Sequence, residues 1–337
     1  MKSIVCVKPN EFAVKEIKAP ILQPGRAIVR IKRIGICGTD LHAYRGNQPY
    51  FTYPRILGHE LGGIVEEIGE NADGIRSGDQ VAIIPYLECG ICIACRRGKT
   101  NCCTEMKVIG VHQDGGMREK ISVPVKNLVK TAGLTLDEAA MAEPLAIGAH
   151  AVRRSFLTKR ETILVIGAGP IGLGVMAFAK DQGANVIAMD INEERLGFCK
   201  SWAKVDATVN GLHKPLERLE ELTNGDLPTI VFDATGNVKS MTKAFQYVAH
   251  GGSLVYVGLV KDEISFSDPE FHKKELTLLS SRNATREDFD YVLETLSAGE
   301  IDIDRYITHR CQFNEMIDQF EGWLLPESKV IKAIVEL

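Results

Sequence analysis

Short stretches of alternating or β-branched residues predict strands in the first 130 residues of the chain. Residues 27–32 alternate apolar and charged positions, as a strand with one buried face does. Residues 62–68 and 80–84 are further strand candidates, because Gly, Asp and Pro residues bound them. Helical periodicity is sparse in this region. The pattern therefore predicts a mainly-β N-terminal part.

The pattern changes near residue 136 to helices and strands in alternation. Residues 136–156 are rich in Ala, Leu, Ile and Glu and predict a helix, with a break or kink expected at Pro144. β-branched runs and helical stretches then follow each other, which favours a parallel sheet covered on both faces. The expected strands are 162–166, 186–189, 230–232 and 254–257, and the helices between them include 173–181 and 239–248.

After about residue 283 the alternation loosens. A helix is expected at 288–297, then mixed elements, then a strand within 330–337. The predicted fold class is α/β, with a doubly wound parallel sheet inserted in a mainly-β domain. We expect the mainly-β domain to comprise residues 1–147 and 284–337, and the inserted domain to comprise residues 148–283.

The composition and charge of the chain argue against several classes of protein. A length of 337 residues suggests about two domains, and 45% hydrophobic with 25% charged residues is ordinary for a globular protein. The net charge of −4 gives no basic excess for a nucleic-acid partner. No apolar run approaches the length of a membrane span, and residues 1–10 lack the features of a signal peptide. We therefore expect a cytoplasmic protein with neither nucleic-acid nor membrane partners.

A glycine fingerprint follows the first β-branched strand of the inserted domain and opens an apolar helix. Gly167, Gly169 and Gly172 form the motif G-x-G-x-x-G, which encloses Pro170 and Ile171. The glycines permit a tight turn, a close approach to a pyrophosphate and the packing of helix on strand. The helix N-terminus offers unpaired N–H groups to the phosphates. This context predicts a dinucleotide site.

The expected partner of the adenosine ribose is Asp190, which ends the next strand, 23 residues after Gly167. Its carboxylate would accept hydrogen bonds from the ribose hydroxyls and repel a 2′-phosphate, which favours NAD over NADP. Arg195 complicates this interpretation, because an arginine can accommodate that phosphate. Asp190 could alternatively cap the helix that follows it.

Four of the nine cysteines, Cys89, Cys92, Cys95 and Cys103, fall within fifteen residues. In a reducing compartment such a cluster indicates metal binding rather than disulfides. Four thiolates close a tetrahedral shell around Zn²⁺ and leave no open position, so the predicted site is structural. Cys102 neighbours Cys103 and competes with it for the fourth place.

A second set of possible zinc ligands is dispersed along the chain. Cys37, His59 and Glu60 lie in glycine-punctuated turns, and Glu143 lies in an apolar region where a bare carboxylate is costly. All three residue types bind zinc, and a zinc site with an open position is catalytic. Spacing alone does not join these segments.

Taken together and in this order, the segments resemble the zinc-dependent medium-chain dehydrogenases over the whole chain. The markers are residues 35–40 around Cys37, the Gly-His-Glu of residues 58–60, the four cysteines and the glycine fingerprint. The resemblance implies a GroES-like catalytic domain with two zinc sites and a Rossmann-type NAD-binding domain. It also implies assembly as a homodimer or homotetramer.

The same resemblance assigns ligands. It implies catalytic zinc bound by Cys37, His59 and Glu143, with Glu60 either a direct ligand or a partner of the ligands. It favours Cys103 as the fourth ligand of the structural zinc. It also implies that further residues contact the cofactor, namely Thr235, Val257, Gly258, Leu259, Ser281, Arg282 and Asn283.

Within this family, several longer stretches resemble the bacterial L-galactonate (hexonate) oxidoreductases. One departure is Met117, where an aromatic residue is usual and which we expect near the substrate. The sorbitol-type polyol branch shares much of the framework. The matched stretches are residues 46–49, 97–103, 108–116, 266–275 and 281–285.

The resemblance implies hydride transfer from a secondary hydroxyl of a sugar acid to NAD. Zinc would lower the pKa of that hydroxyl, and Thr39 and His42 would pass its proton to solvent. For the substrate carboxylate the first candidate is Arg282, which could instead serve the nicotinamide end of the cofactor. The other substrate candidates are Lys273, followed by Lys274, and His112.

Two other functions compete with this prediction. One is a polyol dehydrogenase of the sorbitol type, and the other is a dinucleotide-binding protein that has lost catalysis. The zinc content distinguishes an active dehydrogenase from the inactive protein, since an enzyme would bind two zinc ions per chain and an inactive relative only the structural one.

Overall fold

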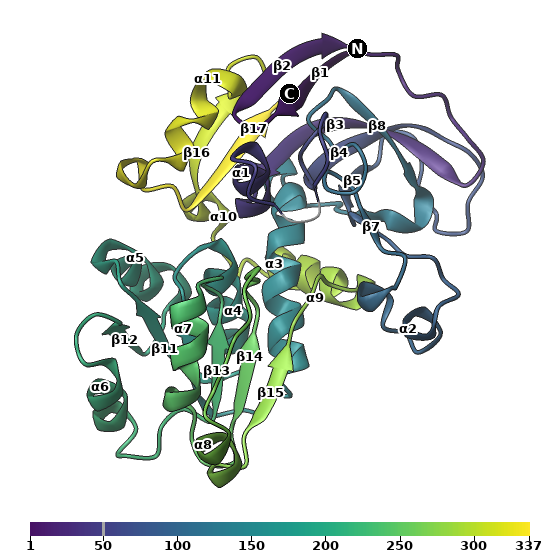
Figure 1. The fold of residues 1–337 in the computed structure, drawn as a ribbon. Coiled ribbons are helices and arrows are strands. Elements are labelled where there is room, and N and C mark those ends of the chain that lie inside the picture. The colour runs from purple at the N-terminus through teal and green to yellow at the C-terminus, as the bar shows by residue number, and fades with distance from the viewer. Residues whose placement is uncertain (49–50) are drawn as a thin grey trace. The chain divides into compact units, whose positions relative to one another are not determined.

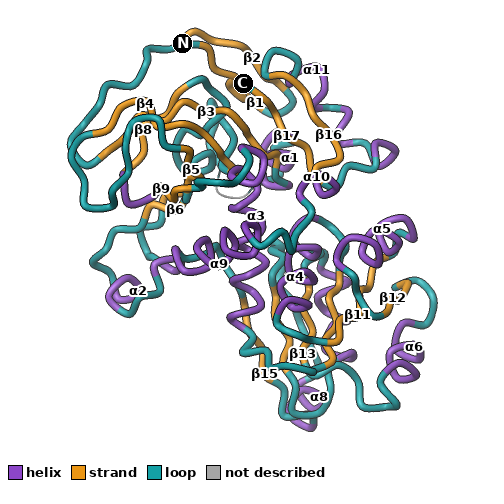
Figure 2. Tube along the Cα trace, turned by 180° about the vertical axis from the view of Figure 1, so that it is seen from behind, coloured by secondary structure: helices purple, strands orange, loops and turns teal. Residues whose placement is uncertain are grey.

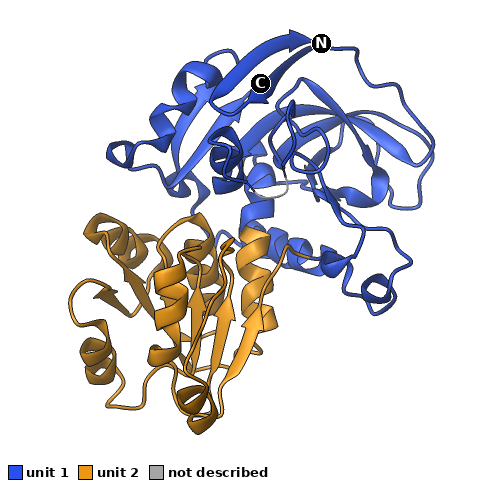
Figure 3. Cartoon of the chain, viewed as in Figure 1, with its two compact units in different colours: residues 1–144, 285–337 blue, residues 145–284 orange. Residues whose placement is uncertain are grey.

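The computed structural model describes residues 1–48 and 51–337, which divide into two compact units (Figure 3). Unit 1 comprises residues 1–144 and 285–337, and unit 2 comprises residues 145–284. Of the residues that mark the resemblance, Pro49 lies outside the described ones. Among the described residues no helix is both long and apolar enough to cross a membrane.

Unit 1 is built on a seven-stranded sheet with the order β16-β17-β3-β4-β5-β9, and β8 also pairs with β3 (Figure 1). The strands predicted at 27–32, 62–68 and 80–84 are confirmed as parts of β3, β4 and β5. Apolar side chains of β3 contribute to the hydrophobic core of unit 1. The strands of unit 1 are β1 (Lys2–Lys8), β2 (Glu11–Glu16), β3 (Arg26–Ile36), β4 (Glu60–Ile68), β5 (Gln80–Ile83), β6 (Tyr86–Leu87), β7 (Lys107–Val108), β8 (Lys120–Pro124), β9 (Leu128–Lys130), β16 (Ile307–Gln312) and β17 (Lys332–Glu336).

Strand β17, from the C-terminal part of the chain, lies between β16 and β3 in this sheet. It runs antiparallel to β3, with Ala333 opposite Ile36, and parallel to β16. The strand predicted within 330–337 is therefore confirmed. The helices of unit 1 are α1 (Gly38–Tyr44), α2 (Ile93–Arg96), α9 (Arg286–Ser297), α10 (Ile303–Tyr306) and α11 (Met316–Phe320).

Unit 2 contains the predicted parallel sheet, six strands in the order β12-β11-β10-β13-β14-β15. This order is that of a doubly wound dinucleotide-binding sheet, and the four predicted strands are confirmed within it. Figure 2 shows α4, α5 and α6 beside the strands. The strands are β10 (Thr162–Ile166), β11 (Asn185–Asp190), β12 (Ala207–Asn210), β13 (Ile230–Asp233), β14 (Ser253–Tyr256) and β15 (Thr277–Ser280), and the helices are α4 (Pro170–Asp181), α5 (Glu193–Phe198), α6 (Pro215–Leu222), α7 (Val238–Lys243) and α8 (Asp268–Lys273).

Helix α3 (Leu136–Arg154) is continuous through Pro144, so of the break or kink predicted there the break is wrong. A proline inside a helix removes one hydrogen bond and costs about 3 kcal/mol. Small apolar side chains around it, such as Ala140, Ala142 and Ala146, are fully buried. Close packing of this helix offsets the local cost. The helix predicted at 239–248 is instead α7 followed by a 3₁₀ turn at Ala244–Tyr247.

Candidate metal centres and nucleotide site

The four-cysteine loop, residues 89–103, brings its predicted ligands together. The thiol sulfurs of Cys89, Cys92, Cys95 and Cys103 all lie within 4.8 Å of one another. The Cys92 and Cys95 sulfurs are 3.5 Å apart, and Zn–S bonds of about 2.3 Å put tetrahedral sulfurs about 3.8 Å apart. Cys102 is exposed and lies outside the group. The four thiols fit a structural zinc ion.

Local structure prepares the loop for a metal. Strands β6 and β7 pair with each other and hold the two ends of the loop side by side, with Tyr86 opposite Val108. Backbone hydrogen bonds from Cys95 and Thr104 lower the pKa of the Cys92 thiol to about 5, whereas burial and the bond with Cys92 raise the pKa of the Cys95 thiol. Zinc binds thiolate rather than thiol, so the backbone bonds favour the binding form of Cys92.

A second group, which we call the three-donor site, consists of Cys37, His59 and Glu60. Their ligand atoms lie within 4.8 Å of one another, and His59 and Glu60 are buried. The site needs a glycine at position 35, because a Cβ there would lie 2.0 Å from Glu60 Oε2. The structure thus joins segments that spacing alone could not.

Asp40 holds these segments together, a role that the sequence analysis did not assign. Its carboxylate accepts hydrogen bonds from the backbone N–H of Cys37, at 2.9 Å, and of Gly58, at 3.1 Å. The turn before α1 and the turn before β4 are therefore fixed by one buried side chain. In the sequence, Asp40 stands out only as the last residue of the marker at residues 35–40.

His59 supplies the observation that tests whether a metal fits. Its Nδ1 atom is buried and has no hydrogen-bond partner among the described residues, and Asp40 Oδ1 lies 3.8 Å away. Burial by itself lowers the pKa of His59, but the charges of Asp40 and Cys37 outweigh it and hold that pKa well above its ordinary value. A thiol, an imidazole and carboxylates gathered around an unsatisfied ring are a donor set that suits Zn²⁺.

Glu143 lies on α3 and is also buried, but it is not one of the three donors. The hydroxyl of Tyr86 donates a hydrogen bond to its Oε1 atom. Burial raises the pKa of the Glu143 carboxyl to about 7, against the opposing effect of His59. The structure therefore puts Glu143 within electrostatic reach of His59 and ties it to a residue that the sequence analysis missed.

Lys332 is the second residue that the sequence analysis missed. Its Nζ atom donates to both carboxylate oxygens of Glu60, at 2.6 and 2.8 Å, and to the carbonyl of Ile36 at 3.2 Å. Lys332 is 1% exposed and Glu60 is 0% exposed. Burial lowers the pKa of Lys332, but Glu60 outweighs this and the pKa is raised. The one signal in the sequence is a lysine inside the apolar strand of residues 330–335.

This ion pair changes the charge balance of the predicted zinc site. Because the Lys332 ammonium pairs with Glu60, that carboxylate adds no net charge to the predicted zinc site. Thr39 and His42 lie three residues apart on α1, immediately after Cys37, and therefore on one face of the helix. Thr39 is half-buried and His42 is exposed. Exposure to solvent therefore increases from Thr39 to His42.

The glycine fingerprint in unit 2 folds as its motif predicts. Gly167 has a φ of +100°, and a Cβ on Gly172 would lie 1.8 Å from the Gly167 carbonyl oxygen. Gly169 is the N-cap of α4 and leaves its first N–H groups without a side-chain partner. The loop can therefore receive a phosphate.

Asp190 and Arg195 both lie beside this loop. Asp190 accepts hydrogen bonds from the N–H groups of Ala168, at 2.7 Å, and Asn192, at 2.9 Å. The N-cap of α5 is Asn192, so the alternative in which Asp190 caps that helix is wrong. A Cβ on Gly169 would lie 4.0 Å from Nη1 of Arg195. Both side chains are thus in position to influence which nucleotide binds.

The other predicted cofactor residues follow the carboxyl ends of β13, β14 and β15, the edge of a parallel sheet at which ligands bind. Asp233, a buried residue that was not predicted, organises this edge. Its side chain accepts hydrogen bonds from Thr235 and Ser240, and its carbonyl accepts them from Val257 and Gly258. The remaining predicted residues at this edge are Leu259, Ser281, Arg282 and Asn283.

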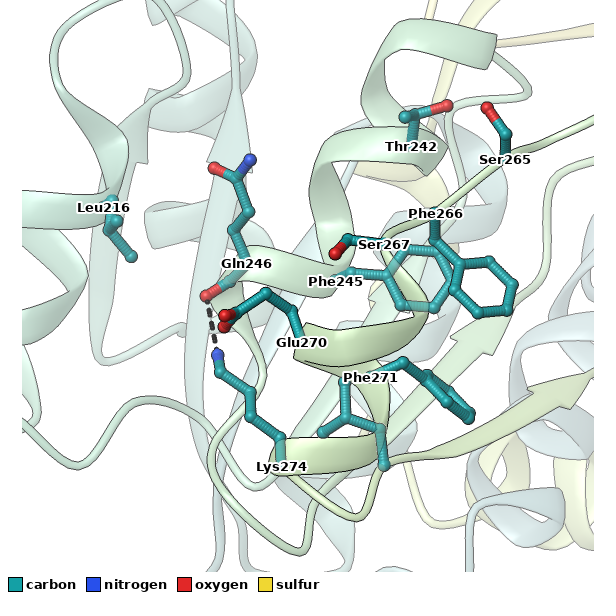
Figure 4. A pocket seen from close by; sticks show the side chains of 11 residues that line it. Leu216, Thr242, Phe245, Gln246, Ser265, Phe266, Ser267, Glu270, Phe271 and Lys274 are labelled. Atoms are coloured by element: carbon teal, nitrogen blue, oxygen red, sulfur yellow. Dashed lines mark hydrogen bonds between the residues drawn. The ribbon is translucent and has the colours of Figure 1, made fainter.

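Lys273 and Lys274 are not brought together with Arg282. They precede β15, whereas Arg282 follows it, so they lie at opposite ends of that strand. Lys274 lines a hollow of about 540 Å³ in unit 2 (Figure 4) and donates to the carbonyls of Gln246 and Val248. Neither lysine shares the nucleotide edge of the sheet.

The predicted substrate residues of unit 1 lie around the loop that follows β7. The Nδ1 atom of His112 accepts a hydrogen bond from the Val108 N–H at 3.0 Å, and His112 is exposed. Met117 is fully buried among core side chains. Met117 therefore fills the core rather than facing a substrate.

Two family models match this chain. The alcohol dehydrogenase GroES-like domain matches residues 23–133, and the zinc-binding dehydrogenase domain matches residues 170–298. L-galactonate-5-dehydrogenase of Escherichia coli K12 is 43% identical over 335 residues, covering 99% of this chain and 98% of that protein. L-idonate 5-dehydrogenase of Vitis vinifera is 32% identical, covering 88% and 83%.

Solved structures agree with this relationship. The crystal structure of RspB from Escherichia coli CFT073 in complex with NADH superposes with a TM-score of 0.93 at 34% identity, covering 100% of this chain and 99% of that one. L-idonate 5-dehydrogenase from Escherichia coli gives a TM-score of 0.89 at 25% identity, covering 100% and 98%.

Proposed function

Because the chain belongs to the GroES-like, zinc-binding alcohol dehydrogenases, we propose that it transfers a hydride from a secondary hydroxyl of a sugar acid to NAD. The proposed substrate is L-galactonate or a related hexonate. The observation that carries the proposal is the three-donor site, where ligand atoms of Cys37, His59 and Glu60 lie within 4.8 Å of one another and His59 Nδ1 has no hydrogen-bond partner among the described residues. The 43% identity to an L-galactonate-5-dehydrogenase over nearly the whole chain supports the substrate class.

In this proposal the two units have different functions. Unit 1 is the catalytic domain and holds two zinc ions, one in the four-cysteine loop and one beside Cys37, His59 and Glu143. Unit 2 is the NAD-binding domain, with the pyrophosphate on the glycine fingerprint and the ribose hydroxyls on Asp190. Arg282 meets either the substrate carboxylate or the nicotinamide end.

Cys37, His59 and Glu143 would hold the catalytic zinc, which would act as a Lewis acid and lower the pKa of the substrate hydroxyl. Residues of this chain remove the hydroxyl proton. Thr39 accepts the hydroxyl proton, because its own hydroxyl both donates and accepts, and His42 passes the proton to solvent. Lys332 pairs with Glu60, so that this carboxylate adds no net charge to the site.

The proposal is tested with L-galactonate, sorbitol and several epimeric hexonates as substrates for NAD⁺ reduction. A charge-assisted hydrogen bond to the carboxylate contributes about 1.5–3 kcal/mol. We therefore expect kcat/KM for a hexonate to exceed that for sorbitol by at least roughly tenfold. Preference for sorbitol would favour the polyol dehydrogenase. Only one zinc per chain and no turnover would favour the inactive dinucleotide-binding protein.

Asp190→Ser should shift the cofactor preference from NAD toward NADP. Loss of hydrogen bonds to the ribose should raise KM for NAD roughly 10- to 100-fold, and loss of the negative charge should raise kcat/KM for NADP. Because Asp190 also holds the Ala168 N–H, a distorted loop would weaken both cofactors. A gain with NADP excludes that cause, whereas unchanged NADP use would contradict the assigned role.

We also propose that the enzyme works in the cytoplasm as a homodimer or homotetramer, without nucleic-acid or membrane partners. All nine cysteines are free, which suits a reducing compartment.

A further inference from the structure

We infer that Tyr86 is a positioning residue for the catalytic metal, which holds the Glu143 carboxylate in place through one oxygen and leaves the other free to coordinate. The inference rests on the proposed function, because it presupposes zinc beside Cys37 and His59. It assigns to Tyr86 a role in the reaction that acts through Glu143.

The contact between the two side chains is direct and shielded from water. Tyr86 and Glu143 are each 5% exposed, and the Tyr86 hydroxyl donates to Glu143 Oε1. In the part of the chain that the structure describes, no residue forms a hydrogen bond with Oε2. A buried carboxylate needs partners, so one oxygen is satisfied by the protein and the second is available to a metal.

Tyr86 is itself held from several directions. The Asn127 side-chain amide donates to the Tyr86 carbonyl at 2.9 Å and to the Ile84 carbonyl at 3.0 Å. The ring packs edge-on against Phe289, with centroids 6.5 Å apart. The backbone pairs with Val108 in β7. The hydroxyl is therefore held in place, and it orients the Glu143 side chain, which has more rotatable bonds.

The two carboxylates near His59 have different partners, which separates their roles. Glu60 is bound through both oxygens by the Lys332 ammonium. Glu143 is bound through one oxygen by a hydroxyl and forms no ion pair with a lysine or arginine among the described residues. Of the two, Glu143 is the one whose anion and free oxygen are available to a cation, and Tyr86 is what sets its direction.

The test is Tyr86→Phe, which removes the hydroxyl and keeps the ring on Phe289. Partners that orient metal ligands typically change metal affinity by about 10- to 100-fold. We expect the affinity of the catalytic zinc, measured by chelator competition, to fall by that factor while the structural zinc stays bound. With Co²⁺ in the catalytic site, the visible absorption spectrum should shift, which a purely structural role would not cause.

Tyr44→Phe is the matched control. Tyr44 is also 5% exposed in unit 1, and its hydroxyl also donates to a carboxylate, that of Glu321, at 2.8 Å. Glu321 is not a predicted ligand, so this variant should keep wild-type zinc affinity and cobalt spectrum. If Tyr86→Phe does not fold, Tyr86→Met fills much of the ring volume without a hydroxyl and carries the same expectation.

A double-mutant cycle with Glu143→Gln shows whether Tyr86 acts through Glu143. The losses in zinc affinity should be less than additive, and additive losses would overturn the inference. So would a Tyr86→Phe protein with unchanged affinity and spectrum. If the wild-type chain binds only the structural zinc, the proposed function fails first, which distinguishes the two failures.

Discussion

Lys332→Met should lower the free energy of unfolding of the protein by about 3–5 kcal/mol, the usual cost of removing one partner of a buried ion pair. Methionine replaces most of the lysine stem, so the loss comes from leaving the Glu60 carboxylate buried without its cation. Activity should fall as well, because an uncompensated Glu60 competes with Glu143 for the metal. Denaturant titration with equal zinc loading measures the first effect.

Fluorescence can report on unit 1 separately. The chain has two tryptophans, Trp202 in unit 2 and Trp323 in unit 1, so a Trp202→Phe background leaves Trp323 as the only reporter. Removing both charges of a buried pair costs far less than removing one. The double variant Glu60→Gln with Lys332→Met should therefore recover most of the lost stability. A double variant as unstable as Lys332→Met would contradict the ion-pair explanation.

Cys103→Ser should reduce the zinc content from two ions to one per chain and lower the melting temperature of the protein. Zinc binding to a structural site contributes directly to folding free energy. A loss of about 3 kcal/mol corresponds to roughly 10 °C at about 2–4 °C per kcal/mol for a unit of this size. Metal analysis and thermal unfolding measure the two effects.

Cys102→Ser provides the neighbouring control. Cys102 is adjacent in sequence, exposed, and outside the group of four thiols. Its substitution should leave zinc content and melting temperature unchanged. If Cys102→Ser lost the zinc and Cys103→Ser kept it, the assignment of the fourth ligand would be reversed.

Local signals made much of this molecule predictable from its sequence. The parallel strands of unit 2 follow from β-branched runs of the right length, and the glycine fingerprint carries its own backbone requirements. The four thiols lie within fifteen residues, so chain connectivity alone brings them near each other. In each case the information lies within one or two neighbouring elements.

The missed features depend on contacts between distant segments. Lys332 and Glu60 are 272 positions apart, and Tyr86 and Glu143 are 57 apart. No periodicity in the sequence links such pairs. That Lys332 is buried becomes evident only from the structure, in which its strand, β17, lies between β16 and β3. The helix break expected at Pro144 is wrong for a related reason. The sequence shows the local cost of a proline in a helix but not the tertiary packing that offsets this cost.

The place of β17 in the chain also sets the order in which the catalytic centre can be completed during protein synthesis. A nascent chain contains Cys37, Glu60 and Glu143 before unit 2 has been translated, and Lys332 emerges last. Until then Glu60 lacks its cation, and one edge of β3 is open to other strands. Insertion of β17 between β16 and β3 is therefore the step that both closes this edge and brings Lys332 to Glu60.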